Sequence, residues 1–157
     1  MELGFKGADL ERLRFHLSLA RQLNAATLRV VITDSDWRPS VERQVAVLTT
    51  LLPELADSGI ILALENHFFC EPRELAEVVR LVADTHVRVC LDTLNSMSLL
   101  VGPRETADTL GSLAATVHVK DGVMQEHKTS YHHCTAYRAG PCDKKRLNEM
   151  SKPYMGT

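Results

Sequence analysis

Three short apolar segments of this sequence each end abruptly in side chains that can bind a metal ion. The segments are LALENH (62–67), VCLDTLN (89–95) and VHVKD (117–121). Glu65 and Asp92 are 27 residues apart, and Asp92 and His118 are 26 residues apart, which is about the length of one strand–helix unit in a parallel α/β fold. Two carboxylates and an imidazole therefore recur at the same point of successive units. In a (β/α) barrel that point is the C-terminal end of the strands, where active sites are built.

The segments between these strands have the periodicity of amphipathic helices. A first helix is expected over about 10–23, Ser40 can cap a second helix that Gly59 ends, and Pro72 suits the first turn of a third. A short fourth helix is expected from Gly102 onward. The strands expected between the helices cover residues 28–32, 60–64, 87–91 and 115–119.

Nearly continuous apolar strands that alternate with helices indicate a parallel sheet covered on both faces. On this pattern alone, the four expected strands fit either an open doubly wound sheet or half of an eight-stranded barrel. No glycine-rich G-x-G-x-x-G segment or phosphate-binding loop follows any of these strands. The sequence therefore gives no indication of a nucleotide-binding site.

The composition of the chain changes near residue 121. Residues 1–121 hold 12 Lys and Arg against 17 Asp and Glu, a charge difference of −5, whereas residues 122–157 hold 6 against 3, a difference of +3. The second part also has no apolar run longer than two residues. We therefore expect residues 1–121 to form the fold and residues 122–157 to be a poorly specified, irregular tail.

The overall charge and hydropathy exclude several classes of partner. A net charge of −2 gives no reason to expect nucleic acid or an acidic membrane. No apolar run approaches the length of a membrane span, and the N-terminus lacks the basic start and apolar centre of a signal peptide, so the cytoplasm is the expected compartment. The four cysteines form no C-x-x-C pair, and Cys90 is expected to be a small core residue.

The segments LENH (64–67), LDTLN (91–95) and HVKD (118–121) resemble the xylose isomerase-like TIM-barrel superfamily, and in particular its sugar phosphate isomerase/epimerase members. The likeness runs from about residue 9 to residue 122. It implies that Glu65, Asp92 and His118 end barrel strands 4, 5 and 6. The expected fold is therefore an incomplete (β/α)8 barrel of about four parallel strands, resembling strands 3–6, with their helices.

The resemblance also implies a chemistry, namely proton transfer at the carbon next to a carbonyl of a sugar or sugar-like substrate. Glu65, Asp92 and His118 would hold Mn²⁺, Mg²⁺, Co²⁺ or Zn²⁺, bound weakly if at all in this chain. Glu65 would in addition act as the catalytic acid or base. The residues expected to contact the substrate are His67, Asn95 and Lys120.

The chain departs from the family pattern after the third segment. The family's fourth metal ligand, a Glu on strand 8, has no match, because the acids of the tail (Glu126, Asp143 and Glu149) end no apolar run. Strands 1, 2, 7 and 8 would be missing, as a truncated gene or a change of reading frame after about residue 122 would explain. We therefore expect any isomerase activity of this chain to be impaired.

Two other functions stay open on the sequence. One is an endonuclease IV-like DNA repair enzyme fragment, against which the −5 charge of residues 1–121 and the few histidines argue. The other is a non-catalytic remnant or interaction module. An arc of four strands would leave the strands at 28–32 and 115–119 unpaired on one side, so self-association through open barrel edges is expected.

Overall fold

The computed structural model describes residues 1–33, 38–127 and 130–141, with side chains as far as Lys120. The side chains of the predicted tail therefore all fall outside the described ones, and residues 128–129 and 142–157 of it are not described at all. None of the helices in the described ranges is long and apolar enough to cross a membrane.

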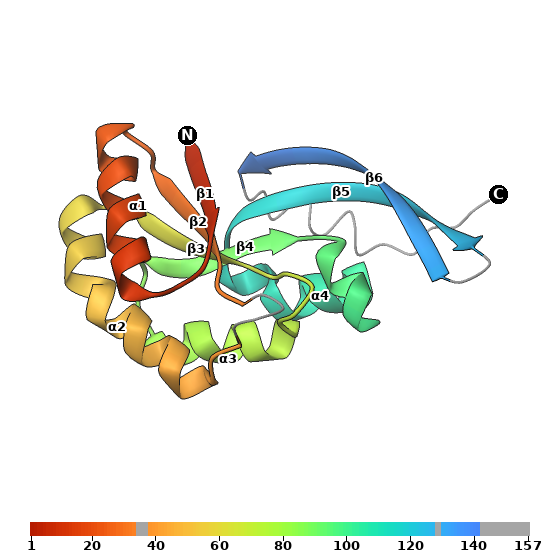
Figure 1. Ribbon diagram of the computed structural model, residues 1–157, viewed down its shortest axis with the longest axis horizontal. Coiled ribbons are helices and arrows are strands. Elements are labelled where there is room, and N and C mark those ends of the chain that lie inside the picture. The colour runs from red at the N-terminus through yellow and green to blue at the C-terminus, as the bar shows by residue number, and fades with distance from the viewer. Residues whose placement is uncertain (34–37, 128–129, 142–157) are drawn as a thin grey trace.

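The described chain forms one six-stranded sheet with its strands in sequence order, and four α-helices follow the first four strands (Figure 1). The first five strands are parallel and the sixth is antiparallel to the fifth. The strands are β1 (Glu2–Lys6), β2 (Thr27–Val31), β3 (Ile61–Glu65), β4 (Val87–Asp92), β5 (Ala114–His127) and β6 (Ser130–Pro141). The helices are α1 (Leu10–Gln22), α2 (Val41–Ser58), α3 (Pro72–Val82) and α4 (Pro103–Leu110), with short 3₁₀ turns at Asn95–Leu99 and Gly111–Leu113.

The expected α/β alternation is confirmed, but the number of parallel strands is five and not four. The additional strand is β1, which pairs with β2 from Glu2 opposite Thr27 to Lys6 opposite Val31. The two edges expected to be open are both paired, because β1 covers β2 and β6 covers β5. The prediction of unpaired edges at 28–32 and 115–119 was therefore wrong. β5 continues through residue 121 to His127, and the division of the chain at that residue stays a prediction.

The helix boundaries follow the capping signals of the sequence. Ser40 caps α2 by accepting a hydrogen bond from the backbone N–H of Arg43 at 3.4 Å. Gly59 ends α2 in the left-handed conformation, with φ of 65°, which glycine adopts without steric cost. Pro72 occupies the first turn of α3, where its missing N–H is not needed.

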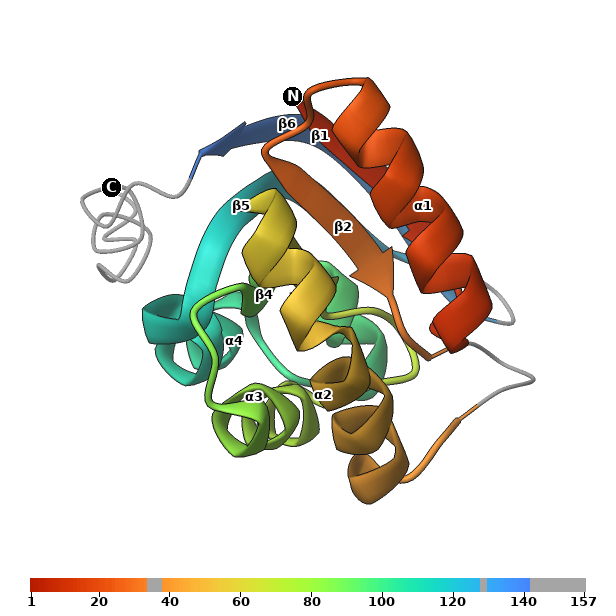
Figure 2. The ribbon, with the colours of Figure 1, turned by 90° about the vertical axis from the view of Figure 1, so that its left-hand side faces the viewer.

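The sheet has an apolar face and a polar face. Leu62 and Leu64 of β3 lie in the core that packs against the helices, so by the alternation of a strand Ala63 and Glu65 point to the other side. The apolar stripe of α3 is buried in the same core and consists of Leu75, Val78, Val79 and Val82. Figure 2 shows the helices on the outer side of the strands, as in a (β/α) barrel.

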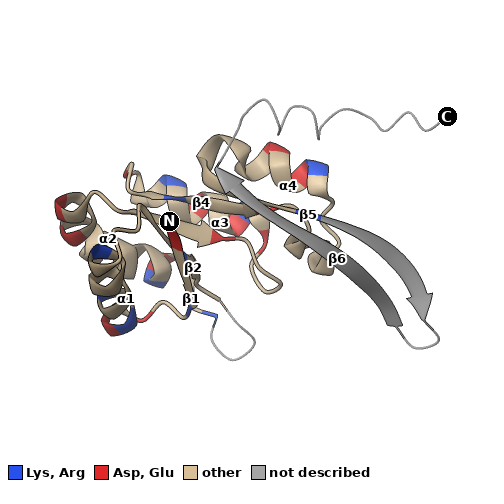
Figure 3. Ribbon diagram, turned by 90° about the horizontal axis from the view of Figure 1, so that it is seen from above, with Lys and Arg blue, Asp and Glu red and all other residues tan. Residues whose placement is uncertain are grey.

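The helices are also joined by exposed ion pairs. Arg14 and Arg21 of α1 bind Glu54 and Asp57 of α2 at 2.7 and 2.9 Å. Charges of both signs are interspersed along these helices (Figure 3). Such exposed pairs contribute at most about 1 kcal/mol each, so the buried apolar stripes hold the helices in place.

Candidate metal centre

Glu65, Asp92 and His118 come together on three neighbouring strands, at the level where β3 and β4 end. Glu65 and Asp92 are the last residues of β3 and β4, and His118 lies directly opposite Asp92 in the register of β4 and β5. All three are buried, with exposed fractions of 5%, 0% and 4%. One ligand atom from each lies within 4.8 Å of the other two. The convergence expected from the 27- and 26-residue spacing is therefore present.

Asp92 is held by the turn that follows β4. Its Oδ1 accepts hydrogen bonds from the backbone N–H groups of Leu94 and Asn95, at 3.0 and 2.9 Å. Its Oδ2 makes no hydrogen bond of good geometry, although Lys120 Nζ lies 2.7 Å away and forms an ion pair with it. Oδ1 thus orients the carboxylate through these two hydrogen bonds. Oδ2, which lies beside Lys120, is the oxygen through which a metal ion would bind.

Asn66 fixes the backbone on which Asp92 is mounted. Its side chain accepts a hydrogen bond from the Asp92 N–H at 2.7 Å and donates to the Asp92 carbonyl at 2.9 Å. It also donates to Ser96 Oγ at 2.9 Å. Asn66 is fully buried, and buried polar groups of this kind rigidify a site when every partner is present.

Glu65 is surrounded by donors. Arg29 of β2 forms a salt bridge with Glu65 Oε2, and Asn95 Nδ2 donates to Oε1 at 3.2 Å. Burial raises the pKa of Glu65, but its hydrogen bonds and charge interactions with His118 and Arg29 outweigh burial and lower the pKa below its ordinary value. Glu65 is therefore ionised at neutral pH, as both a metal ligand and a general base need to be.

His118 has acidic groups beside both ring nitrogens. Nδ1 lies 3.8 Å from Glu65 Oε1, and Nε2 lies 3.0 Å from Glu2 Oε1. Burial lowers the pKa of His118, but hydrogen bonds with Cys90, Glu2 and Glu65 raise it to about 12. The protonated ring thus compensates the carboxylates, and a metal ion would take over that role when it displaced the proton.

The comparisons with known proteins agree with this geometry. A family model described as xylose isomerase-like TIM barrel matches residues 5–148. The chain belongs to the xylose isomerase-like TIM barrel family. This confirms the family expected from the three segments. The match covers most of the chain and extends beyond residue 121.

The individual proteins that this chain resembles differ in what their names describe. The 3-oxo-isoapionate decarboxylase of Pectobacterium atrosepticum is 28% identical over 121 residues, which are 77% of this chain and 44% of the relative. A D-psicose 3-epimerase solved in the presence of D-fructose has a TM-score of 0.59 and 21% identity, covering 70% of this chain and 43% of that one. The IOLI protein with a bound zinc atom has a TM-score of 0.60 and 16% identity, covering 76% and 51%. The two structural similarities show the fold alone, and this chain spans about half the length of each relative or less.

The three residues predicted to contact substrate surround the same centre. Lys120 Nζ donates to Asn95 Oδ1 at 2.9 Å and pairs with Asp92, so it lies within the site. Asn95 is 4% exposed, and its amide hydrogens go to Glu65 and the Asn66 carbonyl, which makes it an orienting group for Glu65. His67 is half-buried against Phe68, with ring centroids 4.3 Å apart, and its contact with a substrate stays a prediction.

Two residues at the centre were not predicted to take part. Arg29 joins Glu65 to Glu2, with its Nε 3.3 Å from Glu2 Oε1. Glu2 lies on the strand that the sequence pattern did not reveal. The sequence signal that could have found Arg29 was the alternation of side chains along β2. This alternation places Arg29 on the same face of the sheet as Ala63 of β3.

Proposed function

We propose that this chain acts, with a divalent metal ion, on a sugar or sugar-derived acid, and moves a proton at the carbon next to a carbonyl. The observation that carries the proposal is the buried convergence of Glu65, Asp92 and His118 beside the C-terminal ends of β3 and β4, on the side of the sheet where barrel enzymes place their active sites. Membership of the xylose isomerase-like family supports the same reaction class. The proposed substrate class is inferred from the names of the relatives.

The donor set fits a divalent cation. Two carboxylates and one imidazole suit Mn²⁺, Mg²⁺, Co²⁺ or Zn²⁺, and ligand type does not select among them. When bound, such an ion polarises a carbonyl oxygen and stabilises the negative charge that develops as the proton leaves. Burial of all three ligands strengthens these interactions, because the local dielectric constant is lower than that of water.

The residues of this chain then have distinct roles. Glu65, kept ionised by Arg29 and His118, accepts the proton from carbon and returns it. Asn95 orients Glu65 through its hydrogen bond to Oε1. Lys120 supplies a positive charge beside Asp92 for a substrate hydroxyl or carboxylate, and His67 borders the site.

Decarboxylation is the second candidate, and the 28% identity with the 3-oxo-isoapionate decarboxylase favours it. Loss of carbon dioxide from a 3-oxo acid leaves an electron pair on the carbon next to the carbonyl, and protonation of that carbon completes the reaction. The same charge stabilisation therefore serves both reactions. The two reactions differ in whether carbon dioxide or a proton leaves that carbon first.

Deuterium incorporation and carbon dioxide release, measured together, separate these possibilities. Ketoses and 3-oxo sugar acids are incubated with the protein and Mn²⁺ in deuterated water, and the products are followed by NMR. We expect deuterium next to the carbonyl, and a loss of 10²- to 10⁴-fold in Glu65→Gln. Carbon dioxide release from the acids would instead select decarboxylation. No exchange and no release from any substrate, with the metal bound, would contradict a catalytic role and favour a non-catalytic module.

A further inference from the structure

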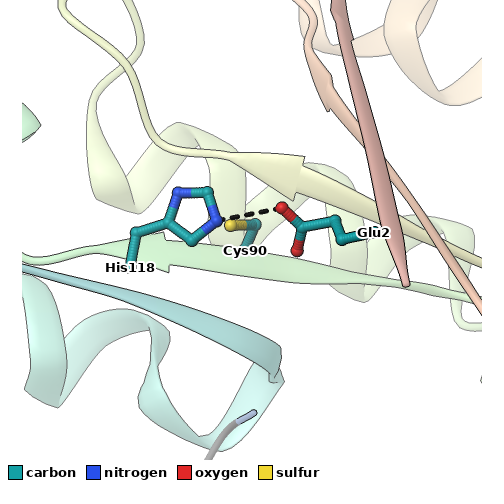
Figure 4. Close-up of side chains that lie close together, drawn as sticks. All are labelled: Glu2, Cys90 and His118. Atoms are coloured by element: carbon teal, nitrogen blue, oxygen red, sulfur yellow. Dashed lines mark hydrogen bonds and ion pairs between the residues drawn. The ribbon is translucent and has the colours of Figure 1, made fainter. Parts of the chain in front are cut away.

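A second group of metal-binding side chains lies beside the candidate metal centre. It consists of Glu2 on β1, Cys90 on β4 and His118 on β5. One ligand atom from each lies within 4.8 Å of the others. Figure 4 shows the Cys90 sulfur lying between the His118 ring and the Glu2 carboxylate. Cys90 and His118 are buried at 0% and 4% exposure, whereas the Glu2 side chain is 28% exposed, which gives a cation a route from solvent.

The separations in this group are close to those of a metal shell. Zinc binds sulfur at about 2.3 Å and imidazole nitrogen at about 2.0 Å, so two tetrahedral ligands are roughly 3.5 Å apart. Nε2 of His118 and Oε1 of Glu2 already lie 3.0 Å apart. Since all ligand atoms lie within 4.8 Å of one another, side-chain movements of about 1.3 Å or less are enough to bring them to this spacing, and water can supply the fourth ligand.

We propose that Glu2, Cys90 and His118 form a second site, which binds a thiophilic divalent cation such as Zn²⁺, Co²⁺ or Cd²⁺. The thiolate distinguishes this site from the oxygen-rich first centre, because sulfur ligands favour softer ions over Mn²⁺ and Mg²⁺. Binding releases the thiol proton of Cys90 and the Nε2 proton of His118 to solvent. Arg29 gives up its contact with Glu2 and keeps its salt bridge to Glu65.

The two sites compete for one side chain. His118 faces Glu65 through Nδ1 and Glu2 through Nε2, and a neutral imidazole has only one nitrogen with a free lone pair. A cation held at the second site through Nε2 therefore leaves Nδ1 protonated and unable to bind a metal. Occupation of the second site removes the imidazole from the first, so a thiophilic cation acts as an inhibitor of any reaction at the first. This regulatory consequence rests on the proposed function, whereas the second site does not.

Cobalt spectroscopy tests the second site directly. A thiolate bound to Co²⁺ gives an intense charge-transfer absorption in the near ultraviolet, which carboxylate and imidazole ligands do not give. The protein for the titration carries Cys70, Cys134 and Cys142 replaced by Ser, so that Cys90 is the one thiol that remains. We expect the band to appear on addition of Co²⁺, to disappear in Cys90→Ala, and to require at least tenfold more Co²⁺ in Glu2→Gln.

A control variant shows whether the thiolate band depends on the first centre. Asp92→Asn removes a ligand of the first centre alone, so the thiolate band should persist in it. A band that is absent from the parent protein, or that survives Cys90→Ala, would overturn the proposal. Circular dichroism of each variant checks folding, and Cys90→Ser repeats the thiol removal with a side chain of nearly the same size. Loss of the band in Asp92→Asn would overturn the claim of two sites while leaving a metal-binding centre intact.

Discussion

His118 Nε2 lies 3.0 Å from Glu2 Oε1 although the two residues are 116 positions apart in the sequence. Glu2 is on the first strand of the sheet and His118 is on the fifth. In a flat sheet, strands four positions apart are separated by about 19 Å, which is further than two side chains can span. The contact therefore shows that the five parallel strands already curl towards a closed barrel, and that their polar side chains meet on the concave face.

Arg29 should stabilise the protein through Glu65. Removing it in Arg29→Met leaves a carboxylate that is 6% exposed without one of its two cationic partners, the other being His118. Because Arg29 itself is 25% exposed, we expect a loss of about 1–3 kcal/mol in the free energy of unfolding, less than for a fully buried pair. Urea denaturation in the presence of a chelator measures it. Arg73→Met, which removes the exposed pair with Glu105, should cost under about 1 kcal/mol.

The salt bridge between Arg29 and Glu65 also predicts that the stability of the protein depends on pH. The pKa of Glu65 is lowered by folding, so its contribution to stability is complete above the unfolded pKa of about 4.3 and is lost as the pH falls through the lower, folded value. Without Arg29 the folded pKa rises, and the contribution should shrink. Unfolding free energies of the wild type and Arg29→Met should therefore converge as the pH is lowered from 7 towards 3. A constant difference across this range would show that Arg29 acts through packing and not through charge.

Asn66 should matter more than an ordinary buried amide. Asn66→Ala removes hydrogen bonds to both backbone groups of Asp92 and to Ser96, which leaves buried polar groups without partners. We expect a cost of about 2–4 kcal/mol in unfolding free energy and a 10- to 100-fold weaker metal affinity. Ser96→Ala, which removes one of these partners alone, should cost about 1 kcal/mol. Equal effects of the two variants would contradict the role given to Asn66.

Gly59 should be required for its backbone conformation and not for space. Its φ is 65°, and a Cβ added there would meet no atom within 4 Å. Gly59→Ala is therefore expected to cost about 1–2 kcal/mol through the left-handed backbone alone. Gly59→Asn should cost less, because asparagine adopts this conformation more readily. Thermal unfolding of the two variants compares them, and an equal or smaller cost for alanine would contradict this explanation.

The sequence predicted the convergence of Glu65, Asp92 and His118 because each occupies the same place in a repeated strand–helix unit. It did not predict β1, since the segment Glu2–Lys6 has only Leu3 and Phe5 as apolar residues on either side of a glycine. This segment is a strand because β2 pairs with it and because both apolar residues pack against the core. The local sequence pattern does not reveal such pairing and packing with residues that are distant in the chain.

The partners of Arg29 were equally beyond a reading of the sequence. Its two carboxylates lie 27 positions before it and 36 positions after it, and neither spacing has a meaning within one strand or helix. Gly4 is part of the same arrangement, because a Cβ at that position would collide with the Arg29 guanidinium. Which side chains meet on the inner face thus depends on the curvature of the sheet. The pattern of apolar residues along each strand does not specify that curvature.

We propose that Glu65, Asp92 and His118 bind one divalent ion together. Calorimetric titration with Mn²⁺ tests it, with Asp92→Ala as the variant and Glu105→Gln, an exposed carboxylate on α4, as the control. We expect binding by the wild type and by Glu105→Gln, and an affinity at least 10- to 100-fold lower in Asp92→Ala, since losing a ligand should weaken the site no less than losing a supporting hydrogen bond. Mn²⁺ binding of equal strength in Asp92→Ala and the wild type would contradict it.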